Sequence, residues 1–120
     1  METMTQENKE LLLKDLCARL PYGTLVYAQN AVDWYEDEIN TQVLSDAINE
    51  DYVIKPYLFP LSSMTEEQKK EFDTTLKYLP AEEINFWTLN TYDWCNKNHF
   101  DYRCLIEKGL ALDATGLNVY

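Results

Sequence analysis

Residues 11–28, LLLKDLCARLPYGTLVYA, decide the class of fold, because this stretch changes from a helical pattern to a strand pattern. Its apolar side chains recur at spacings of three and four residues, which indicates one face of an amphipathic helix. These apolar positions are Leu12, Leu13, Leu16, Cys17 and Leu20. The charged side chains are expected on the other side of the helix, and they are Lys9, Lys14, Asp15 and Arg19.

The helix and the strand have recognisable ends. Thr5 is a suitable N-cap, and Pro21 stops the helix after about four turns, since the residue before a proline is pushed out of the helical region. Gly23 then permits a sharp turn. Residues 24–28 form a short run rich in β-forming side chains, which predicts a strand.

A further strand is predicted by residues 52–54 and 57–59. Pro56 and Pro60 confine this strand to a sheet edge or to breaks in the hydrogen-bond ladder, because proline has no N–H to donate.

Residues 30–52 fit two structures. Alternation at residues 34–35 and 38–43 favours strands, whereas Val43 with Ala47 has the spacing of a helical face. We favour strands with irregular connections.

Residues 63–80 predict a second helix. Ser63 with Glu66 three residues later has the spacing of a capping box, and Glu67 adds an acid near the positive end of the helix dipole. The apolar face then runs to Pro80 through Phe72, Leu76 and Leu79.

The last part of the chain predicts shorter elements. Thr91 is expected to cap a helix that runs to about Asn98, and Asp101 to cap another turn that Gly109 closes. Residues 110–112 add a final short strand. We therefore predict an α+β fold with an N-terminal helix, a small antiparallel sheet or meander, and two or three further helices packed on it.

Length and composition favour one folded domain over residues 1–120. A hydrophobic fraction of 46% and an aromatic fraction of 13% are too high for a disordered chain, even at a net charge of −11. The 21 acidic residues against 10 lysines and arginines argue against direct nucleic-acid binding. No apolar run reaches the ~20 residues of a membrane helix, so no membrane association is expected.

The distribution of charge gives the strongest functional signal. No basic residue occurs between Arg19 and Lys55, whereas seven carboxylates lie in that gap together with a Trp-Tyr pair. Such a combination resembles an interface anchor with a charged rim, although strand alternation sends one of the two rings toward the core. We predict a surface that binds a basic partner, formed by Trp34, Tyr35, Glu36, Asp37, Glu38, Asp46, Glu50 and Asp51, with Asp33 as the seventh acid.

The cysteines offer an alternative chemistry. Cys95, His99 and Cys104 have the spacing C-x3-H-x4-C, and in a helix Cys95 and His99 would share a face. The set lacks a fourth zinc ligand, and no protease or hydrolase signature surrounds either thiol, so a structural role is the main hypothesis. No cofactor and no catalytic residue is predicted. Three widely spaced cysteines also indicate reduced thiols in a cytoplasm.

Three stretches, residues 11–23 (LLLKDLCARLPYG), 55–67 (KPYLFPLSSMTEE) and 98–112 (NHFDYRCLIEKGLAL), carry a resemblance. They resemble a group of small uncharacterised proteins encoded in gut-bacterial genomes and their prophages and mobile elements. The resemblance implies a bacterial or prophage setting and an α+β scaffold, and it transfers no catalytic residue. Residues 24–53 match no part of it, which suggests a variable face on a shared scaffold.

These observations lead to one functional hypothesis and two alternatives. The hypothesis is a small, acidic, non-enzymatic accessory protein that binds a basic partner, in its sharpest form as a nucleic-acid mimic that occupies the channel of a host protein. The first alternative is a metal-binding protein or enzyme centred on Cys95, His99 and Cys104. The second is a scaffold protein in which Trp34 and Tyr35 face another copy of the chain.

Overall fold

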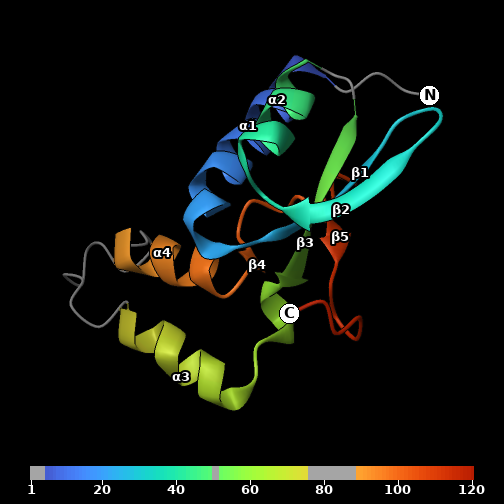
Figure 1. Ribbon diagram of the computed structural model, residues 1–120. Helices are drawn as coiled ribbons and strands as arrows, with labels where there is room; N and C mark the ends of the chain where they lie inside the picture. The colour runs from blue at the N-terminus through green and yellow to red at the C-terminus, as the bar shows by residue number, and fades with distance from the viewer. Residues whose placement is uncertain (1–4, 50–51, 76–88) are drawn as a thin grey trace.

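The computed structural model describes residues 5–49, 52–75 and 89–120, shown as a coloured ribbon in Figure 1. The helices are α1 (Gln6–Arg19), α2 (Thr41–Ile48), α3 (Glu66–Thr75) and α4 (Leu89–Lys97), with 3-10 turns at Leu20–Tyr22 and Leu61–Ser63. The strands are β1 (Leu25–Gln29), β2 (Trp34–Glu38), β3 (Val53–Pro60), β4 (Phe100–Asp101) and β5 (Leu112–Asp113). The predicted α+β class is confirmed.

The sheet is mixed and has the order β2-β1-β3-β4, with β5 also paired to β3. β1 pairs antiparallel with β2 and with β3, as the predicted meander requires, whereas the two-residue strands β4 and β5 run parallel to β3. β2 is therefore an edge strand of the sheet in the part of the chain that the structure describes.

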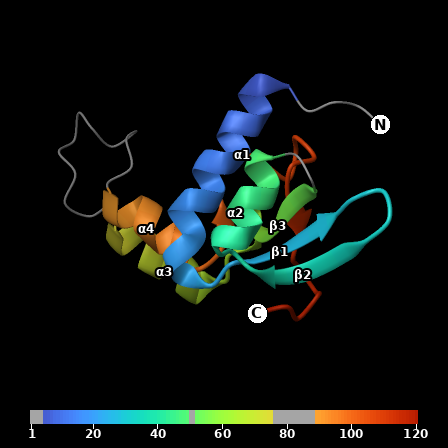
Figure 2. The same cartoon turned by 45° about the horizontal axis from the view of Figure 1, so that its top comes forward.

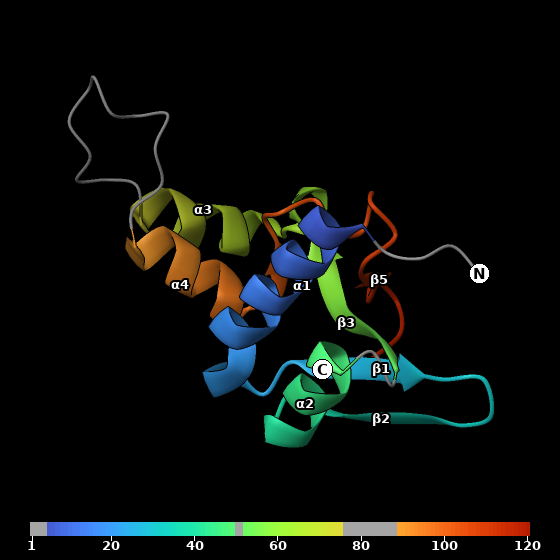
Figure 3. The ribbon, with the colours of Figure 1, turned by 90° about the horizontal axis from the view of Figure 1, so that it is seen from above.

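One face of the sheet is covered by α1 and α2, which lie side by side over β1 and β3 (Figure 2). The core between these layers is apolar and almost completely buried. It contains Leu12 and Leu16 from α1, Val43 from α2, and Val26, Ala28, Ile54 and Leu58 from the sheet. None of the described helices covers the opposite face of β1 and β2, which is called the open face below (Figure 3).

The helices α3 and α4 form a separate pair beside the end of α1, far from the β1–β2 hairpin (Figure 3). Their rings pack edge to face, with 5.8 Å between the centroids of Phe72 and Trp94, and Trp94 also stacks on Phe100 of β4. Leu76, Leu79 and Pro80, which the sequence assigned to the second helix, lie outside the described residues.

The N-terminal helix confirms its predicted ends and corrects its predicted face. Thr5 Oγ1 accepts a hydrogen bond from the Asn8 N–H at 3.1 Å, and Gly23 adopts the left-handed φ of 65° that the turn into β1 requires. However, Asp15 and Arg19 are completely buried, whereas Cys17 is exposed and Leu20 is 39% exposed. The buried face follows positions 12, 15, 16 and 19 and therefore includes an ion pair.

The described residues between 30 and 52 contain one strand, β2, and one helix, α2. The strand predicted at residues 34–35 extends as β2 to Glu38, but the strand predicted across residues 38–43 is wrong. Asn40 caps α2 instead, with its Oδ1 accepting from the Val43 N–H at 2.9 Å. Val43 and Ala47 then point into the core, as their helical spacing allowed.

The proline positions of β3 agree with the prediction of a break in the ladder. Pro56 pairs with Val26 at the last position of the β1 ladder, and the pairing with β5 begins one residue later at Tyr57. β3 can therefore contain Pro56 although it lies inside the sheet, because the pairing of β3 with β1 ends at that residue and its pairing with β5 begins at the next.

The capping box of α3 lies two residues after the predicted one. Thr65 Oγ1 accepts from the Gln68 N–H at 3.1 Å, and Gln68 Oε1 accepts from the Thr65 N–H at 2.9 Å. Ser63 instead donates to the Pro60 carbonyl. Thr91 lies inside α4 rather than at its cap, because this helix already begins at Leu89.

Candidate functional site

β2 places its side chains alternately on the two faces of the sheet. Trp34, Glu36 and Glu38 oppose the β1 residues Gln29, Tyr27 and Leu25, so all six lie on the open face. Tyr35 and Asp37 oppose Ala28 and Val26, which are completely buried under the helices. The three side chains Trp34, Glu36 and Glu38, with Tyr27 beneath Trp34, are called the β2 surface below.

Trp34 is the exposed aromatic side chain of the β2 surface. It is 58% exposed, yet its ring is stacked on that of Tyr27 with 5.8 Å between centroids and 19° between planes. One face of the indole is thereby fixed by the sheet, and the other remains available to solvent or to a partner. A held and exposed tryptophan is the kind of side chain that anchors protein interfaces.

The carboxylates on and next to β2 form no ion pair within the described residues. Among the described residues, no lysine or arginine forms an ion pair with Asp33, Glu36, Asp37 or Glu38. Burial, followed by the neighbouring carboxylate of Glu36, raises the pKa of Tyr57 on β3. The carboxylate of Glu38 lies beside Gly23, 3.6 Å from the position that a Cβ would take there. This arrangement keeps negative charge on the open face.

The free edge of β2 is partly closed by two aspartates. The bonds from Ile39 N to Thr24 O and from Asn30 N to Asp33 O set the alternation of the ladder, so the N–H groups of Trp34, Glu36 and Glu38 point away from β1. The Trp34 N–H donates to Asp33 Oδ1 and the Glu38 N–H donates to Asp37 Oδ1, both at 2.8 Å. These carboxylates protect the edge against pairing with another strand.

Two predicted surface residues serve the interior instead. The hydroxyl of Tyr35 donates to Asp46 at 2.8 Å, and its ring meets that of Tyr52 edge-on at 5.0 Å. Burial and this hydrogen bond raise the pKa of Tyr35. Asp46 is only 7% exposed and also accepts from Gln42 at 3.0 Å, so its prediction as part of the exposed surface is wrong.

Three further residues of the predicted surface also do not contribute to the open face. Asp37 accepts from the Asn40 amide at 3.0 Å beside the start of α2, and it points away from the open face. Glu50 and Asp51 lie outside the described residues. The acidic tract is therefore not one continuous surface, and its exposed part on the open face is the pair Glu36 and Glu38.

The cysteine and histidine side chains do not form the alternative site. α4 ends at Lys97 and His99 has a φ of 63°, so the helical face predicted for Cys95 and His99 does not exist. Burial raises the pKa of the Cys95 thiol to about 11. Cys104, in contrast, is exposed. Within residues 5–49, 52–75 and 89–120, no three His, Cys, Asp or Glu side chains are placed to hold a metal ion.

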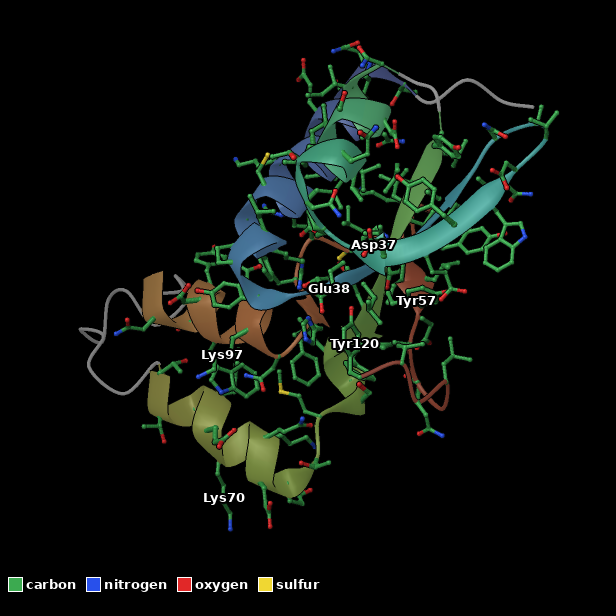
Figure 4. All side chains as sticks on the ribbon, viewed as in Figure 1. Asp37, Glu38, Tyr57, Lys70, Lys97 and Tyr120 are labelled. Carbon is green, nitrogen blue, oxygen red and sulfur yellow. The ribbon has the colours of Figure 1, made fainter. Side chains whose placement is uncertain are left out.

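His99 is a neutral part of the packing. Its Nδ1 lies 2.9 Å from Thr24 Oγ1, and its ring stacks on Tyr120 at 3.8 Å with 7° between planes. Burial, with the nearby charge of Arg19, lowers the pKa of His99 to about 4. The Tyr120 hydroxyl accepts from the Leu25 N–H and donates to the Tyr57 carbonyl, which joins this stack to β1 and β3 (Figure 4).

A charged cluster inside the fold was missed at the sequence level. Asp15 accepts from Arg19 Nε at 2.8 Å and from Arg103 Nε at 3.1 Å, and Arg19 Nη2 donates to the Phe100 carbonyl at 2.6 Å. Both guanidinium groups also face the ring of Tyr102. The signal was present, since Asp15 and Arg19 continue the helical spacing that begins at Leu12. This cluster joins α1 to β4.

Asp101 confirms its predicted role as a cap. Its carboxylate accepts from the N–H groups of Leu105 and Ile106 at 3.0 and 2.9 Å, and Gly109 closes the turn with a φ of 74°. Asp101 thereby shapes the turn that leads into β5, and this turn forms one wall of a groove described below.

No helix among the described residues is long and apolar enough to cross a membrane. Compared with known proteins, the chain matches no family model, and the comparisons find neither a curated protein nor a solved structure similar to it.

Proposed function

We propose that this protein is a non-enzymatic interaction protein whose β2 surface binds a basic segment of a protein partner. The observation that carries the proposal is the position of Trp34, which is 58% exposed while its inner face is held on Tyr27. Glu36 and Glu38 lie on the same face, and within the described part of the chain neither forms an ion pair. A bacterial or prophage-encoded protein of the cytoplasm fits the reduced thiols and the resemblance given above.

The chemistry of this surface selects a cationic partner. A guanidinium or ammonium group over the free face of an indole gains roughly 0.5–2 kcal/mol, and Arg is the more common choice. Glu36 and Glu38 follow Trp34 at every second residue, about 7 Å apart along a strand. An extended segment with Arg or Lys at alternate positions can therefore match all three side chains at once.

The surface also excludes other partners. Nucleic acid would meet two carboxylates and no basic side chain on β2, which opposes binding to a phosphate backbone. A nucleic-acid mimic is the narrower form of the same proposal. In that case the basic partner would itself be a nucleic-acid-binding protein, and duplex DNA would compete with this protein for it.

The proposal is tested with a synthetic peptide that alternates Arg and Val, and with a matched peptide that carries Glu in place of Arg. Titrations followed by the NMR indole N–H signal of Trp34 should show saturable binding of the Arg peptide only. Binding should weaken as salt rises, because exposed charges are screened. Replacing Trp34 by Ala should abolish most of the affinity.

The charge requirement has a matched control in the chain. The double variant E36Q/E38Q removes two exposed acids from β2, and E66Q/E67Q removes two exposed acids from α3. Only the first should weaken binding of the Arg peptide and flatten its salt dependence. Equal weakening by both variants, or equal binding of the Arg and Glu peptides, would show that the β2 surface is not the binding site.

A further inference from the structure

A groove on the open face of the sheet has a charge unlike that of the rest of the chain. It is an open groove of about 1030 Å³ between β1, β3, β5, the start of α1 and the turn at residues 108–110. Tyr27, Tyr57, Val53 and Leu112 give it apolar walls. A groove of this size can take a ligand of several rings, since small-molecule sites typically enclose ~300–1,000 Å³.

Among the described residues, those that line the groove include Lys55 and Lys108 but no aspartate or glutamate. This is unexpected in a chain with 21 acidic residues and only 10 lysines and arginines. Among the described residues, neither lysine forms an ion pair. The groove therefore carries two lysines without an ion pair among the described residues, in a protein whose net charge is −11.

Lys55 is held in place by the sheet. It pairs with Tyr27 across the antiparallel ladder, and its neighbours on the same face of β3 are Val53 and Tyr57. Its side chain is half-buried between these groups, which hold its aliphatic stem against the sheet. Lys108 approaches from the turn shaped by Asp101, and the first turn of α1 lies at the rim at Thr5 and Asn8.

We propose that this groove binds a small aromatic carboxylate. The aromatic ring would pack against Tyr27 and Tyr57, and the carboxylate would bind the ammonium groups of Lys55 and Lys108. The argument is one of charge and shape complementarity, because a ligand in the groove would meet two lysines, while the carboxylate of Glu36 lies at its edge beside Tyr57. It does not depend on the partner proposed for the β2 surface, although Tyr27 contributes to both.

The probes are phenylacetate, its neutral analogue phenylacetamide and its cationic analogue phenethylamine. In ¹⁵N-¹H spectra of the full chain, phenylacetate should shift the amide signals of Val53, Lys55 and Leu112 in a saturable way. The neutral and cationic analogues should bind at least tenfold more weakly. Raising the salt concentration should weaken only the binding of phenylacetate.

The variants K55Q and K108Q should each weaken phenylacetate binding several-fold, and the double variant should reduce it to the level of phenylacetamide. K70Q on α3 and K97Q on α4 serve as matched controls, because these lysines lie far from Tyr57 (Figure 4). Their affinities should stay within twofold of the original. The proposal would be overturned by equal binding of all three probes, by no saturable shift at the groove, or by equal losses in all four variants.

Discussion

Arg19 and Asp15 lie one helical turn apart on α1 and form an ion pair that is completely buried, with 2.8 Å between Nε and Oδ2. The same carboxylate also binds Arg103, which comes from the opposite end of the chain. Burying a guanidinium group beside a carboxylate is costly unless the groups are well paired, and Arg19 is the fully buried one, whereas the Arg103 side chain is 17% exposed. Arg19 Nε and Nη2 have the partners Asp15 and the Phe100 carbonyl, and the Tyr102 ring faces the guanidinium, but Arg19 Nη1 is buried without a hydrogen-bond partner.

Replacing Asp15 by Asn should destabilise the protein strongly. The shape of the side chain is kept, but Arg19 would remain buried without a negative charge, which typically costs about 3–5 kcal/mol. Urea unfolding followed by circular dichroism measures this loss. The control is K69Q, which removes the exposed pair between Lys69 and Glu66 at 3.8 Å and should change the free energy of unfolding by less than about 1 kcal/mol. A small effect of D15N would show that the buried pair contributes little.

Stability should fall as the pH drops from about 6.5 to about 4. An unfolded histidine has a pKa of roughly 6.5, whereas burial lowers the pKa of His99 to about 4. In this window the unfolded chain binds a proton that folded His99 does not, so protonation favours unfolding. Above the window both states are neutral, and below it both are charged.

The variant H99N isolates this contribution, since Asn tolerates the positive φ of this position better than most residues. H99N should show a shallower decline of stability than the original protein between pH 6.5 and 4.5. An NMR titration of the His99 ring with a midpoint near 6.5 would contradict the burial argument.

The three thiols should differ sharply in reactivity. Cys17 and Cys104 are exposed and should react quickly with an aromatic disulfide reagent at pH 8. Cys95 should react only after unfolding, because it is buried and burial raises its pKa to about 11. The double variant C17S/C104S should show no fast phase, whereas C95S should keep the whole of it.

The start of α3 should depend on Thr65 rather than on Ser63. T65A removes the acceptor for the Gln68 N–H and should cost about 1 kcal/mol of helix stability. Amide hydrogen exchange along α3 should therefore accelerate in T65A. In S63A it should change little, because Ser63 bonds the Pro60 carbonyl outside the helix. Faster amide exchange in S63A than in T65A would instead support the cap at Ser63 that the sequence pattern predicts.

The sequence correctly predicted those features that depend only on residues close together in the chain. Thr5, Gly23 and Asp101 act on neighbouring backbone groups, so their roles follow from positions a few residues apart. The charged cluster could be predicted only in part, because the spacing of Asp15 and Arg19 after Leu12 indicates the buried face of the helix but not their partners. Asp15 and Arg19 read as surface residues because their further partners, Arg103 and Phe100, are brought to them only by the fold.

The candidate site was likewise predictable where it depends on neighbouring residues, but not where it depends on contacts between distant segments. Alternation along residues 34–38 correctly required one ring of the Trp-Tyr pair to face inward, but only the fold shows that it is Tyr35. The error at Asp46 has the same cause, since its partner is that inward tyrosine. The groove joins Lys55 to Lys108 across β3 and β5, and no pattern within either segment indicates this proximity.

The contacts of Arg19 and Arg103 also constrain how the chain folds. The bond from Arg19 to Phe100 spans 81 residues and that from Arg103 to Asp15 spans 88, so each closes a loop over most of the chain. A polypeptide shortened before Phe100 would contain α1 and the β1–β2 hairpin but would lack the carbonyl that receives the Arg19 guanidinium. We therefore expect the two ends of the chain to acquire their structure together, in a slow and highly cooperative transition.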